Sequence, residues 1–112
     1  MSIFGFRTRS AERDEATDAG RLERLARLLD ELTNEISVEK AGLENRYRSA
    51  TTDAAFLVDA IENDGVSDRS RDRVDDLTAA ILSCEKRLAI LARQVVLLDD
   101  FRKELASLAT PP

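Results

Sequence analysis

The sequence predicts an all-α protein, a long antiparallel two-helix hairpin of the coiled-coil type that dimerises into a four-helix bundle. Large apolar residues recur at spacings of three and four along most of the chain, which is the periodicity of a helix with one buried stripe. A single break, Asn63-Asp64-Gly65, divides this pattern into two arms. The 112 residues include only 4 Gly and 2 Pro, too few for the many turns of an all-β fold.

Two regions are expected. Residues 1–20 form an N-terminal leader that is flexible or partly helical, because residues 11–20 contain no large apolar side chain. Residues 21–109 form the hairpin, with a first helix at about 21–63, a turn at 64–66 and a second helix at about 67–108. The stripe of the first helix consists of Leu22, Leu25, Leu29, Leu32, Ile36, Leu43, Tyr47, Ala50, Ala54, Leu57 and Ile61.

The turn carries its own signals. A Gly after a helical run suits the left-handed position that ends many helices, because it has no Cβ to clash, so Gly65 is expected there. Ser67 is a good N-cap for the second helix. Asp68 follows in the first turn, where the helix dipole favours a negative charge.

The second stripe matches the first when the chain folds back at the turn. Its members are Val74, Leu77, Ile81, Cys84, Leu88, Leu91, Val95, Leu98, Leu105 and Leu108. Leu57 then pairs with Val74, and the same register brings Leu29 to Arg102, the only polar interruption. Arg102 is expected to bury its stem and reach Asp30 or Asp99.

One irregularity is expected in the first helix. The stripe steps from Ile36 to Leu43 across Glu39 and Lys40, and such a shift locally unwinds a left-handed supercoil. Leu91 of the second helix faces this step. The step is a tolerated defect, a hinge or a place where a partner's backbone approaches closely.

A hairpin buries only one stripe per helix, so apolar residues outside the stripes indicate a further interface. Near the open end these residues are Leu28, Ile90, Leu97, Phe101 and Leu108. We expect them to form the contact between two copies of the chain, or with another protein's helix. Deeper along the arms, Cys84 is expected to be a structural, buried thiol.

The N-terminus offers a second candidate contact. Ile3, Phe4 and Phe6 precede two Arg and could dock on a partner or touch a membrane surface. This apolar stretch is too short for a signal-peptide core or a membrane span, so a cytoplasmic protein is expected.

Composition limits the chemistry. With 0 His and 1 Cys, we expect no catalytic residue, no metal site and no cofactor, and therefore no enzyme. A net charge of −5 with 4% aromatic residues argues against nucleic acid as a partner.

A non-enzymatic protein–protein interaction module, acting as a scaffold or adaptor, is the favoured function. The alternatives are a chaperone that shields a partner's helix during export or assembly, and a peripheral membrane-surface protein. The predicted hairpin is similar in size to secretion and flagellar export chaperones, an architectural resemblance that assigns no residue. Secreted hairpins of the Trp-x-Gly type are also similar in length, but the turn here lacks their Trp.

Overall fold

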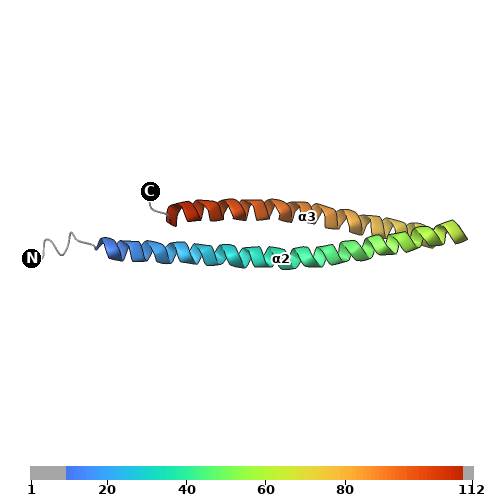
Figure 1. The fold of residues 1–112 in the computed structure, drawn as a ribbon. Coiled ribbons are helices and arrows are strands. Elements are labelled where there is room, and N and C mark those ends of the chain that lie inside the picture. Colours follow the sequence, from blue (N-terminus) through green and yellow to red (C-terminus); the bar gives the residue numbers. More distant parts are fainter. Residues whose placement is uncertain (1–9, 110–112) are drawn as a thin grey trace, which may run out of the picture. The chain divides into compact units, whose positions relative to one another are not determined.

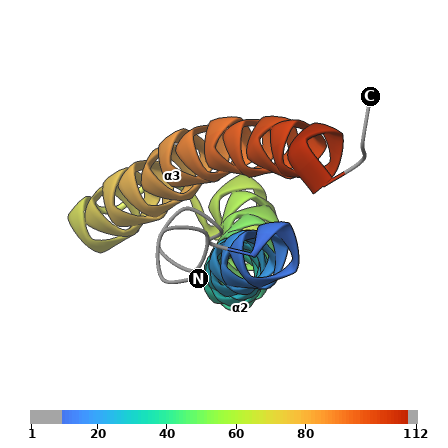
Figure 2. The same ribbon diagram turned by 90° about the vertical axis from the view of Figure 1, so that its left-hand side faces the viewer.

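The computed structural model describes residues 10–109, and these residues form two long helices (Figure 1). Helix α2 spans Ala11–Asp64 and helix α3 spans Asp68–Ala109. The described residues contain no strand. The prediction of an all-α, two-helix hairpin is therefore confirmed, and α3 returns beside α2 (Figures 1 and 2).

The turn forms as the sequence indicates. Gly65 has a φ of 82°, the left-handed conformation, and its N–H donates to the Ile61 carbonyl at 2.8 Å, which closes α2. Ser67 caps α3 because its Oγ accepts from the Ser70 N–H at 3.1 Å. Ser70 reciprocates, since its Oγ accepts from the Ser67 N–H at 2.8 Å.

Helix α2 begins well before its apolar stripe. Its first residue is Ala11, and Ser10 caps it by accepting a hydrogen bond from the Arg13 N–H at 3.3 Å. Glu12 and Asp14 place negative charge in the first turn, which the helix dipole favours. Residues 11–20 are thus helical although they carry no large apolar side chain.

The described chain divides into two compact units, each made from parts of both helices. The first unit contains residues 10–34 and 96–109, and the second contains residues 35–95. In the first unit, Leu29 and Leu98 are buried. In the second, the core is formed by Leu43, Cys84 and Leu91, with Ile36, Tyr47 and Leu88 packed against it.

Leu91 is the most buried large side chain, at 1% exposure. It was expected to face the step between Ile36 and Leu43, and it packs in the cluster that contains both. α2 continues through Glu39 and Lys40 as an unbroken α-helix, so the step in the stripe does not interrupt the helix. The local unwinding of the supercoil at this step stays a prediction.

The ends of the stripes differ from the prediction. Leu25 is 43% exposed, Val74 38% and Leu108 72%, although all three were assigned to the stripes. In the first unit, Leu22 and Leu105 instead line a shallow groove with small residues, namely Ala26, Ala106 and Ala109. A straight helix has 3.6 residues per turn, so a stripe drifts around it, and here the drift carries the contact from Leu25 to Ala26.

Candidate functional site

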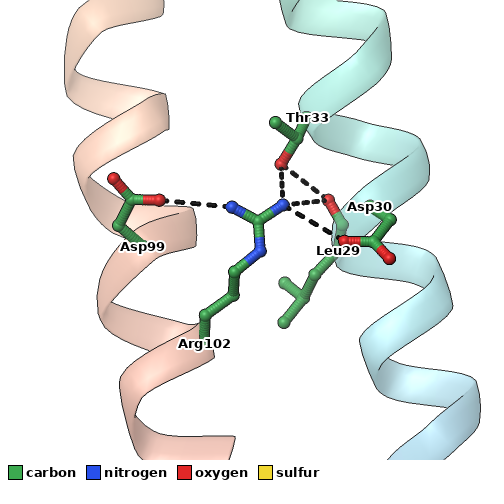
Figure 3. A network of polar contacts seen from close by, with 5 residues as sticks. All are labelled: Leu29, Asp30, Thr33, Asp99 and Arg102. Atoms are coloured by element: carbon green, nitrogen blue, oxygen red, sulfur yellow. Dashed lines mark hydrogen bonds and ion pairs between the residues drawn. The ribbon is translucent and has the colours of Figure 1, made fainter.

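Arg102 forms the largest polar network between the two helices of the first unit (Figure 3). Its Nη1 donates to Asp99 Oδ1 at 3.2 Å, within α3. Its Nη2 lies 3.4 Å from Asp30 Oδ1 and 2.5 Å from Thr33 Oγ1, both on α2. The guanidinium of Arg102 therefore links α3 to α2 through a carboxylate oxygen and a hydroxyl oxygen.

Thr33 completes the network because its hydroxyl both accepts and donates a hydrogen bond. It accepts from Arg102 and donates to the Leu29 carbonyl at 2.8 Å. The same carbonyl also lies 3.4 Å from Arg102 Nη2. The side chain of Arg102 is 35% exposed, so its stem packs in the stripe while its head stays at the edge.

The sequence predicted the contacts of Arg102 with Asp30 and Asp99, and both are confirmed. The contact with Thr33 was missed. Thr33 lies one turn after Leu29 on α2, so a hydroxyl next to the stripe and opposite an Arg was the signal that could have indicated it.

A second polar contact joins the helices of the second unit. Arg87 of α3 donates two hydrogen bonds to the Glu39 carboxylate of α2, from Nε at 2.5 Å and from Nη2 at 3.0 Å. This paired geometry fits a guanidinium to a carboxylate. The two hydrogen bonds from Arg87 lower the pKa of Glu39, and partial desolvation opposes them. The same contact raises the pKa of Arg87.

Six large apolar side chains of the first unit are exposed, and Val96 is one of them. We call the other five the flank surface and define it as Leu25, Leu28, Leu97, Phe101 and Leu108. The helical rotation places these five on one flank of the buried Leu29 and Leu98. Leu28 is 48% exposed and Phe101 50%. Their relative position follows from the Arg102 network and from the helical rotation of about 100° per residue.

Asp30 and Asp99 lie on one side of the helix pair because one guanidinium binds both. Leu28 is two residues before Asp30, and Phe101 is two residues after Asp99. A separation of two residues turns a side chain to roughly the opposite side of its helix. Leu28 and Phe101 therefore lie together on the side that faces away from the Arg102 network.

The other predicted contact residues have different positions. Ile90 is 42% exposed and belongs to the second unit, apart from the flank surface. Ile3, Phe4 and Phe6 lie outside the described residues. Cys84 is a free and buried thiol, as the sequence indicated.

Two further properties concern residues 10–109 alone. Neither helix contains a stretch that is long and apolar enough to cross a membrane. No group of three or more acidic or Cys side chains is placed to hold a metal ion in this part of the chain.

Comparisons with protein-family models, curated proteins and solved structures found no match for this chain.

The Arg102 network is expected to stabilise the first unit. Arg102→Ala removes the guanidinium from Asp30 and Thr33, and we expect it to lower the free energy of unfolding by about 1 kcal/mol, since the site is partly exposed. Chemical denaturation followed by circular dichroism measures this difference. The neighbouring exposed residue provides the control, and Lys103→Ala is expected to change stability by less than about 0.5 kcal/mol. Equal effects of both variants would contradict a specific role for Arg102.

The contact between Glu39 and Arg87 is expected to make the stability of the folded chain depend on pH in the acidic range. The folded state lowers the pKa of Glu39 below its ordinary value of 4.5, so the stabilisation is complete above that value. It is lost as the pH falls through the lower pKa of the folded state. The difference in melting temperature between the natural chain and Glu39→Gln should therefore shrink on acidification. Glu62→Gln, an exposed residue of α2, is the control, and a pH-independent difference for Glu39→Gln would refute the prediction.

Proposed function

We propose that this chain is a non-enzymatic helical interaction module that binds through the flank surface. Its immediate partner in this proposal is a second copy of the chain, and two hairpins pair into a four-helix bundle. Such a dimer would act as a scaffold or adaptor for other proteins. The observation that supports the proposal most strongly is the exposure of five large apolar residues on one side of the first unit.

The small amount of buried apolar surface supports a second layer of helices. The side chains buried in the described residues all come from the contact between α2 and α3, namely Leu29, Leu43, Ala50, Leu77, Cys84, Leu91 and Leu98. Packing of one hairpin on another would remove from water apolar side chains that the contact between α2 and α3 leaves exposed.

The residue types of the flank surface are those of an interface centre. The surface contains Phe101 and four Leu residues, two of them on α2 and two on α3. Aromatic and large aliphatic side chains of this kind form the centres of interfaces.

A chaperone for another protein's amphipathic helix would use the same surface. The two functions differ in the behaviour of the isolated chain. A dimer covers its own flank surface, whereas a chaperone without its client leaves that surface open, which promotes aggregation.

The dimer is tested with a charge placed in the flank surface. Phe101→Glu places two carboxylates in the contact, one from each copy. We expect this to weaken dimerisation by about 2 kcal/mol or more. Light scattering coupled to size-exclusion chromatography gives the mass, and circular dichroism checks that the helices persist.

Phe56→Glu is the matched control for this experiment. Phe56 is 71% exposed on α2 but lies in the second unit, outside the flank surface. We expect this variant to remain a dimer. A natural chain that is a well-folded monomer at micromolar concentration would overturn the proposal, and so would equal loss of the dimer in both variants.

A further inference from the structure

We infer that the two copies pack antiparallel across the flank surface, with α2 against the partner's α2 and a two-fold axis that passes near Leu28. This inference rests on the proposed dimer and adds its orientation. It is supported by the order of apolar and charged residues along α2 in the first unit.

The apolar side chains on this side of α2 form a short row of Leu25, Leu28 and Leu32. Their spacing of three and four residues is that of one coiled-coil seam, and it lies beside the contact with α3. An antiparallel partner centred on Leu28 places Leu28 against its own copy and Leu25 against the partner's Leu32. On α3 the same axis brings Leu97 to the partner's Leu108, since each Leu28 lies beside the segment between them. Leu25, Leu28, Leu97 and Leu108 then each have an apolar neighbour in the partner.

Two charged residues at the outer edge of this row select the direction. Arg24 and Glu31 are both exposed, and they lie seven residues apart on one face of α2. Neither takes part in an ion pair within the described residues, in contrast to Arg27, which pairs with Glu23 at 2.8 Å. The antiparallel arrangement brings Arg24 to the partner's Glu31, and the two-fold axis forms this contact twice.

The other arrangements give unfavourable charge contacts. If α2 packed parallel on the partner's α2, Arg24 would meet Arg24 and Glu31 would meet Glu31. If the two-fold axis ran parallel to the helices, α2 would pack on the partner's α3. The residues would then pair across the dimer as they pair between α2 and α3 within one hairpin. That register pairs Leu29 with Arg102, so it brings Glu31 to Asp100, and both are acidic. Of these three arrangements, the antiparallel one pairs opposite charges at this edge.

The orientation is tested by distances between spin labels in the full-length dimer. One label is attached at Glu15→Cys and, in a matched variant, at Ala19→Cys, two exposed positions one turn apart on the same face of α2. Cys84 is 6% exposed, so we expect it not to react, and treatment of the natural chain with the same reagent is the control. At 1.5 Å per residue from an axis at Leu28, the antiparallel dimer predicts about 39 Å between the labels at residue 15 and about 27 Å at residue 19.

The two alternatives predict a different result. In both, equivalent residues lie at the same height along the bundle, so both labels give short distances that do not differ between the variants. A dimer with two equal, short distances would overturn the inferred orientation but leave the proposed dimer intact. Absence of any dimer by light scattering would instead refute the proposed function.

A charge exchange tests the contact that sets the direction. Arg24→Glu turns two attractions into repulsions and should weaken dimerisation roughly fivefold, as should Glu31→Arg. The double variant restores opposite charges in the antiparallel arrangement and should regain the affinity of the natural chain. Failure of the double variant to recover, with helix content unchanged, would contradict the pairing of Arg24 with the partner's Glu31.

Discussion

A helix with a single neighbouring helix can bury only one stripe of its surface, and this constraint governs the chain. In each unit, the buried side chains lie where α2 and α3 meet, and Leu91 fills the most enclosed position. Apolar residues beside the stripe, such as Leu28 and Phe101, are then left in contact with water. The contact between the two helices therefore buries one row of apolar side chains and leaves a second row exposed.

Polar contacts between the helices complement this apolar line. Arg102 replaces an apolar residue in the stripe of α3 and contacts Thr33, Asp30 and the Leu29 carbonyl of α2. Arg87 donates two hydrogen bonds to Glu39, which lies where the stripe of α2 steps from Ile36 to Leu43. Both contacts require one alignment of the helices, because a slip by one residue would separate the guanidinium from its acceptors. They specify register more than they add stability, since both lie at the edge of the contact, where water screens charge.

The sequence was sufficient to predict the hairpin because its two stripes share one register and because Gly65 and Ser67 are strong local signals. It did not indicate that α2 begins at Ala11, since the Ser10 cap and the acidic first turn stabilise a helix without apolar residues. Leu25 and Leu108 were assigned to the stripe because they continue its spacing, but the stripe rotates around the helix, and both side chains are exposed. The hydrogen bond from Arg102 to Thr33 was not predicted, because it depends on the distance between the two helices, which the sequence does not give. The sequence singled out Leu28, Leu97, Phe101 and Leu108 of the flank surface, but it grouped them with Ile90 instead of Leu25. The position of the surface opposite the Arg102 network required the structure. Whether it binds a second copy stays a prediction.

The central claim is that this hairpin completes its apolar core only by association with a second copy. Thermal unfolding at a series of protein concentrations tests it most directly, because a folded dimer that unfolds to monomers is stabilised by mass action. The melting temperature of the full-length chain is expected to rise steadily with concentration, together with a mass of two chains before the transition. A cooperative transition at one fixed temperature across the whole series, with the mass of a single chain, would contradict the claim.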